Sequence, residues 1–199
     1  MKAAIFVSFC FFLFSCKEKE IFLSPKLVDI NEVIETVVFK DSLPVLVNDT
    51  NNSRISLRLN KIEVKIMPAI KEGELDIPEE PGSYAYVQQL LYSNKQSEGI
   101  FSKADSTYLL YQNKVHESLN IDLAFSKKLR TISNEEAKAD RYGSMHYYSL
   151  SIPIFSKDGN TAYVEGNYYF GAEGGGWAIV LKRKNGEWEI IKTFRRWIS

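Results

Sequence analysis

The strongest indication of the fold is in residues 145–199, MHYYSLSIPIFSKDGNTAYVEGNYYFGAEGGGWAIVLKRKNGEWEIIKTFRRWIS. This stretch contains all three tryptophans of the chain, and much of it alternates apolar with polar residues between clusters of turn-forming residues. This pattern is typical of short strands joined by turns. We expect four consecutive antiparallel strands, over residues 146–155, 161–170, 177–184 and 187–198.

The turns between these strands carry different signals. Asn185-Gly186 is typical of a two-residue type I′ turn, which needs φ above zero at both central positions. Residues 171–176 predict a wide hairpin loop or a bulge, and Pro153 predicts an edge position or a bulge because it cannot donate to a ladder. The register set by the Asn-Gly turn pairs Lys184 with Glu187, Arg183 with Trp188, Lys182 with Glu189, Leu181 with Ile190, Val180 with Ile191, and Trp177 with Phe194.

The rest of the chain adds helices and short strands. Residues 29–32 have the spacing of a capping box, and apolar residues then recur at helical spacing up to Val38. Shorter patterns predict a strand at 62–67, an acidic loop at 71–82, a helix at 83–94, capping boxes at 102–105 and 133–136, and a strand at 119–125. This order predicts a single α+β domain, in which an antiparallel sheet with a C-terminal four-stranded meander has helices packed on one face.

The N-terminus has the features of an export signal. A basic start precedes an uncharged apolar run that is too short to span a bilayer, so we expect residues 1–15 to be a signal peptide. Its end, Leu13-Phe14-Ser15-Cys16, resembles a bacterial lipobox, which implies that Cys16 is lipidated and anchors the chain to a membrane. The alternative is an ordinary signal peptide that happens to contain cysteine. We expect a lipidated cysteine and charged tether at 16–26, and the domain at 27–199.

Composition excludes several classes of function. The formal net charge is zero, so we expect no nucleic-acid partner. His116 and His146 have no partner at metal-ligand spacing, and the glycines at 171–176 lead into a strand where a phosphate loop would lead into a helix, so we expect neither metal nor cofactor. If the leader is removed and Cys16 is lipidated, no thiol remains for a disulfide or a cysteine nucleophile.

Two sets of residues are candidates for function. Glu165, Glu173 and His146 are the candidates for catalysis, because two carboxylates near one end of the meander would suit a hydrolase. The alternative for His146 is a hydrogen-bonded sheet residue.

Trp177, Tyr168 and Tyr148 are the candidates for binding, since amphipathic rings on an exposed sheet face suit sugars and peptides. Neighbouring tyrosines such as Tyr168 and Tyr169 must point to opposite faces, so not all of them fit one core. The alternative is that helices cover the face on which the candidates lie.

The motifs S-x-P-x-F-S-x-D-G at 151–159, N-G-x-W at 185–188 and W-I-S at 197–199 resemble a C-terminal block of uncharacterised lipoproteins of Bacteroidota, the flavobacterial group. Asp105-Ser106 with Leu110 and Gln112 resembles a weaker upstream element of the same family. The resemblance implies no established activity, cofactor or catalytic residue. The charged run at 17–20 resembles the segment that follows the lipidated cysteine in surface-exposed lipoproteins of Bacteroidota, which implies an export signal; the alternative is a plain spacer.

Together these observations predict a cell-envelope lipoprotein, on the periplasmic face of the outer membrane or at the cell surface. We expect a binding or interaction module for a peptide, a glycan or a protein. One alternative is an envelope hydrolase that uses carboxylates near residues 171–176. Another is an accessory or immunity-like protein with a broad apolar patch in place of a pocket.

Overall fold

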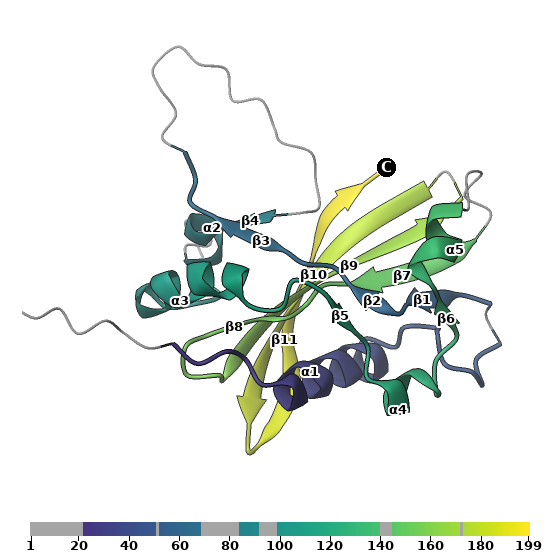
Figure 1. Ribbon diagram of the computed structural model, residues 1–199, viewed down its shortest axis with the longest axis horizontal. Coiled ribbons are helices and arrows are strands. Elements are labelled where there is room, and N and C mark those ends of the chain that lie inside the picture. The colour runs from purple at the N-terminus through teal and green to yellow at the C-terminus, as the bar shows by residue number, and fades with distance from the viewer. Residues whose placement is uncertain (1–21, 51, 69–83, 92–98, 140–144, 172) are drawn as a thin grey trace, which may run out of the picture.

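The computed structural model describes residues 22–50, 52–68, 84–91, 99–139, 145–171 and 173–199. Its main element is a seven-stranded sheet in the order β11-β10-β9-β7-β1-β6, with β8 also paired to β9 (Figure 1). Only β1 makes parallel pairs in this sheet, with β6 and β7. The predicted α+β class, with a mostly antiparallel sheet and a C-terminal meander, is confirmed. The strands are β1 (Arg54–Ser56), β6 (Thr131–Ile132), β7 (His146–Leu150), β8 (Ile154–Phe155), β9 (Thr161–Phe170), β10 (Glu173–Lys184) and β11 (Glu187–Ile198).

The meander follows the predicted strands with two differences. β9 and β11 have the predicted ends, but the first strand is divided into β7 and β8. Pro153 lies in the interruption, as expected for a residue with no N–H to donate. The second difference is that β10 begins at Glu173, four residues earlier than predicted.

The glycine-rich segment is therefore strand over residues 174–176, which corrects the prediction of a wide loop, whereas the register shift against β11 between Gly176 and Trp177 agrees with the other prediction, a bulge. A Cβ on Gly176 would lie 2.1 Å from Nε1 of Trp197, so the tryptophan ring occupies the space above this glycine. Of the described residues in this segment, only Gly171 has a positive φ, of 67°. The segment looks like a loop in sequence because it lacks side chains, but in the sheet that lack admits aromatic rings.

The Asn185-Gly186 turn has the predicted positive φ values, 53° and 89°. The pairs nearest this turn are as predicted, from Lys184 with Glu187 to Leu181 with Ile190. The register then shifts, so Val180 pairs with Lys192 and not with Ile191, and Trp177 pairs with Arg195 and not with Phe194. The shifts are β-bulges, which leave Ile191 and Arg196 of β11 without a partner in β10.

Helix α1 (Leu27–Lys40) covers one face of the sheet. The five apolar residues that recur at helical spacing are all buried: Ile30, Val33, Ile34, Val37 and Val38. The predicted capping box is wrong, because the helix begins before Asp29 and the N-cap Lys26 makes no side-chain cap. Asp29 accepts a hydrogen bond of 2.7 Å from Arg183 of β10. The carboxylate thus joins the helix to the sheet instead of capping it.

The opposite face has its own apolar cluster. Ala178 and Val180 of β10 point into it, whereas Ile179 and Leu181 point toward α1. Apolar residues of a two-stranded sheet and of two short helices complete the cluster, so the helices are not confined to one face. The elements are β3 (Glu63–Lys65), β4 (Tyr84–Tyr86), α2 (Val87–Leu91) and α3 (Ser106–Tyr111).

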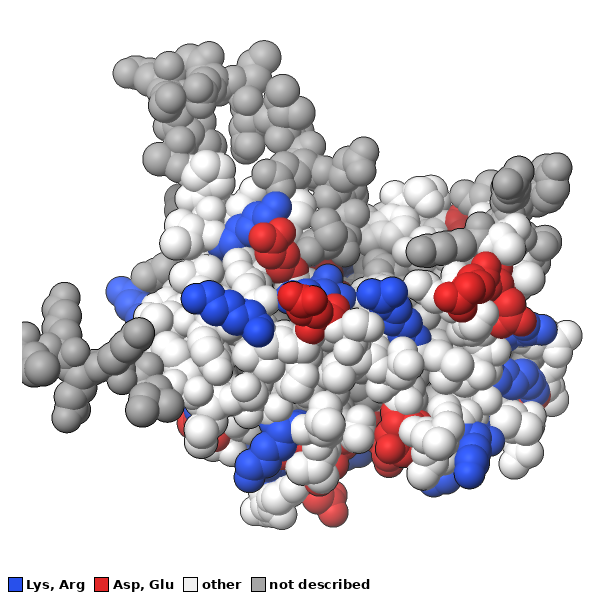
Figure 2. Space-filling view, viewed as in Figure 1, with Lys and Arg blue, Asp and Glu red and all other residues white. Residues whose placement is uncertain are grey.

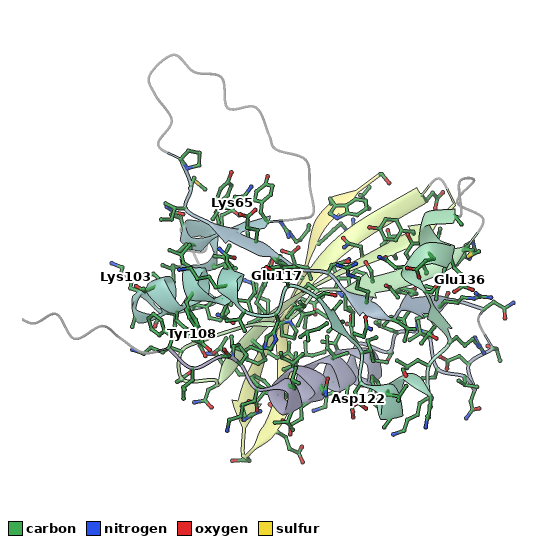
Figure 3. The ribbon with its side chains drawn as sticks, in the orientation of Figure 1. Lys65, Lys103, Tyr108, Glu117, Asp122 and Glu136 are labelled. Carbon is green, nitrogen blue, oxygen red and sulfur yellow. The ribbon has the colours of Figure 1, made fainter. Side chains whose placement is uncertain are left out.

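The remaining short elements agree in part with the sequence patterns. The capping boxes beginning at Ser102 and Ser133 are present, before η1 (Lys103–Asp105) and α5 (Asn134–Ala139). The strand expected at 119–125 is only β5 (Leu119–Asn120), because Asp122 caps α4 (Leu123–Ser126). β5 pairs with β2 (Arg58–Leu59), and η2 (Gln112–Lys114) follows α3. Figure 3 labels Asp122, which precedes α4, and Glu136, which lies in α5. The acidic loop predicted at 71–82 lies outside the described residues.

Candidate functional site

The three residues predicted to bind a ligand come together on one face of the sheet. Tyr148 of β7 lies directly across from Tyr168 of β9, and Trp177 of β10 lies across from Gly166 of β9. The Trp177 ring centroid is 6.1 Å from that of Tyr148, edge to face, and 6.4 Å from that of Tyr168. Phe170 joins them, 5.3 Å from Tyr168 and 5.7 Å from Tyr148. We call these four residues the aromatic face.

Two glycines make this arrangement possible. A Cβ on Gly166 would lie 2.3 to 2.7 Å from three ring atoms of Trp177. A Cβ on Gly175 would lie 2.5 to 2.6 Å from three atoms of the Tyr168 side chain. Each ring therefore lies across a glycine, with one side against the backbone. Both residues are only partly buried, so part of each side chain remains accessible to solvent.

Asp41 stands where α1 meets the aromatic face. It is the C-cap residue of α1, and its carboxyl group lies near the indole N–H of Trp177, a buried nitrogen that has no hydrogen-bond partner among the described residues. Burial raises the pKa of Asp41 above its ordinary value, and the indole N–H offsets part of that rise. Burial likewise raises the pKa of Tyr148, with a smaller contribution from Tyr168. The phenol of Tyr148 therefore stays protonated at neutral pH and can donate a hydrogen bond.

The candidate catalytic residues lie on different faces. His146 and Glu173 are exposed, and both lie across from Phe170, on strands at either side of it. Because directly paired residues point to the same side of a sheet, both flank the aromatic face. The His146 ring is 4.9 Å from the Phe170 ring.

Glu165 lies on the opposite face and is buried. It forms an ion pair with Arg196 and accepts a hydrogen bond of 2.7 Å from the hydroxyl of Tyr163. The sheet thus stands between Glu165 and Glu173, so the two carboxylates cannot act together on one glycosidic bond. Glu165 therefore has a structural role, as the partner of Arg196 and Tyr163.

Tyr163 gives this buried cluster a measurable pH dependence. Burial raises the pKa of Tyr163 to about 12, against an ordinary value of 10, although Arg196 acts in the opposite direction. Between pH 10 and 12 the unfolded chain loses this proton and the folded chain keeps it, so stability falls as pH rises. We expect a loss of up to about 3 kcal/mol over this range, at about 1.4 kcal/mol per pKa unit.

The measurement is chemical unfolding from pH 8 to 12 of the unsubstituted protein and of Tyr163→Phe. The difference in unfolding free energy between them should shrink above pH 10, because the variant lacks this phenol. Tyr169→Phe is the control, since Tyr169 lies on the same strand and is only partly buried. A constant difference across the pH range would contradict the assignment.

Sequence reasoning missed three residues of these sites. Phe170 completes the aromatic face, Asp41 borders it, and Arg196 balances Glu165. Residues two positions apart in a strand lie on one face, so the sequence alone could have placed Phe170 beside Tyr168. No local signal pointed to Asp41 or Arg196, because their partners are more than 30 residues away in sequence.

Among the described residues, no group of three or more His, Cys, Asp or Glu side chains is placed to hold a metal ion. None of the described helices is long and apolar enough to cross a membrane. On the face shown in Figure 2, basic and acidic side chains are interspersed.

No protein-family model matches this chain, and neither the curated proteins nor the solved structures include a match to it.

Proposed function

We propose that this chain is a lipoprotein of the cell envelope, anchored at Cys16, whose domain binds a glycan on the aromatic face. Cys16 lies outside the described residues, and the lipobox-like sequence before it supports the anchor. The observation that carries the binding proposal is the convergence of Tyr148, Tyr168 and Trp177 from three strands. The anchor would place the domain at the outer membrane, on its periplasmic or outer side.

The geometry favours a glycan over a peptide. The Trp177 and Tyr168 rings lie across glycines and are inclined by 33° to each other, so they offer two neighbouring ring surfaces to a ligand. A sugar ring can place its apolar C–H groups on such surfaces and its hydroxyls at their polar edges. Peptides that add to a sheet need a free strand edge, but β9 and β10 are paired on both sides.

The test is titration calorimetry of the purified protein with oligosaccharides released from cell-wall glycan and from lipopolysaccharide. We expect Tyr168→Ala to weaken binding about ten-fold, because the loss of one stacked ring is worth about 1.4 kcal/mol. Tyr169→Ala is the matched control. Tyr169 is the next residue along the strand, and it stacks on Tyr147 on the opposite face.

Tyr148 and Tyr147 are likewise neighbours on opposite faces of the sheet, so Tyr148→Ala and Tyr147→Ala provide a second comparison. The proposal is wrong if the two members of each pair weaken glycan binding equally. It is also wrong if neither oligosaccharide pool binds while a panel of extended peptides does. Circular dichroism of each variant separates loss of the site from loss of the fold.

A further inference from the structure

The start of the described chain exposes apolar side chains. Leu23 is 79% exposed, Leu27 is 55% exposed and Val28 is 57% exposed. Lys26 lies among them and is also exposed. We call these four residues the seating surface. Large apolar side chains gathered beside a lysine are unusual for a surface that faces only water, and they are typical of segments that rest in a membrane interface.

This segment is held against the domain. The Tyr108 hydroxyl donates a hydrogen bond of 3.0 Å to the Leu23 carbonyl, and the His116 ring lies 3.2 Å from the Pro25 carbonyl oxygen. The Phe22 ring packs on Tyr108, with centroids 5.5 Å apart. Figure 3 labels Tyr108 close to this part of the chain. The apolar side chains are therefore presented in a defined direction by the fold.

The distance to the proposed anchor is short. Cys16 and Phe22 are separated by six residue positions. A fully extended chain of that length spans about 20 Å at most. If Cys16 carries the lipid, Phe22 and its neighbours lie within that distance of the bilayer surface. The start of the described chain is therefore the part of the domain that the anchor holds nearest the lipid.

We propose that the seating surface rests in the headgroup region of the bilayer that carries the lipid anchor. This inference depends on the proposed lipidation of Cys16. Leu23, Leu27 and Val28 enter the boundary between headgroups and acyl chains, and Lys26 extends its amine toward phosphate. Contact of this kind adds to the single lipid anchor and fixes the orientation of the domain.

The orientation sets the direction in which the aromatic face points. The Phe22 segment lines one pocket together with Gly159, which lies in the turn just before β9. β9 then runs from Thr161 to Phe170, and the aromatic face occupies its second half, from Gly166, which lies across from Trp177, to Phe170. Five to nine residues of strand span about 15 to 30 Å. A domain seated at the Phe22 end therefore presents the aromatic face away from the lipid.

The test uses the full lipidated chain in phosphatidylethanolamine–phosphatidylglycerol vesicles that contain lipids with a spin label on the headgroup. The variants Val28→Cys and Ile198→Cys each carry one thiol-reactive fluorophore. They are matched, because Val28 and Ile198 are 57% and 60% exposed. Ile198, at the end of β11, pairs with Gly175, and the Tyr168 ring lies against that glycine. We expect headgroup spin labels to quench the fluorophore at position 28 at least three-fold more than the fluorophore at position 198.

Vesicle flotation separates this inference from the lipidation on which it depends. If the chain does not float with vesicles, both proposals fail. If it floats but both fluorophores are quenched equally, the seating surface alone is wrong. It is also wrong if the fluorophore at position 28 is shielded from water without being quenched by spin-labelled lipid, because a protein would then cover this surface.

Discussion

Replacement of Arg196 by methionine is expected to lower the free energy of unfolding by about 3 to 5 kcal/mol. The Glu165 side chain is only 5% exposed and its charge is balanced by Arg196, whose side chain is 23% exposed. Removal of the guanidinium leaves a buried carboxylate with the Tyr163 hydroxyl but without a charged partner. Urea unfolding at pH 7, followed by circular dichroism, measures the loss.

Arg195 provides a matched control for this substitution. It is adjacent in sequence but exposed, so Arg195→Met should change the unfolding free energy by less than about 0.5 kcal/mol. A double-mutant cycle isolates the pair: in a Glu165→Gln background, Arg196→Met should lose only about 1 kcal/mol, because no buried charge is left behind. Equal losses in both backgrounds would show that Arg196 stabilises the fold through packing and not through Glu165.

The substitution Gly166→Ala is expected to destabilise the fold by about 1 to 3 kcal/mol and to displace the Trp177 ring. The added Cβ would lie 2.3 Å from a ring atom of Trp177, a distance that no real contact allows. The ring must then leave the glycine, and the aromatic face loses its shape. Unfolding measurements give the energy, and acrylamide quenching of tryptophan emission reports the displaced ring.

Two further variants test the cause of this effect. In a Trp177→Leu background, Gly166→Ala should have a much smaller effect, because the ring that it clashes with is gone. Gly186→Ala should also destabilise the protein, since its φ is 89°, but open space surrounds it and tryptophan quenching should not change. If Gly166→Ala leaves both stability and quenching unchanged, the ring does not depend on the glycine.

The sequence alone was sufficient for the elements that local patterns specify. Alternation along 161–170 and 187–198 and the Asn185-Gly186 turn predicted the strands and hairpin found in the fold. The apolar stripe of α1 was predicted for the same reason, since a helix and a strand each impose their own period on the residues that they bury. Placement of Tyr148 and Tyr168 on one face also follows from alternation, once the two strands are known to pair.

The remaining features depend on contacts between residues that are far apart in sequence. The two bulges in β11 displace the predicted register, and one of them leaves Arg196 unpaired, where it meets Glu165. The run at 174–176 lacks strand propensity, yet it is strand because rings from Tyr168 and Trp197 fill the space that side chains would occupy. Asp29 does not cap α1 as predicted; it accepts a hydrogen bond from Arg183, more than 150 residues away in sequence. In each case the outcome depends on a partner distant in sequence, and a local pattern carries no information about the free energy of such a contact.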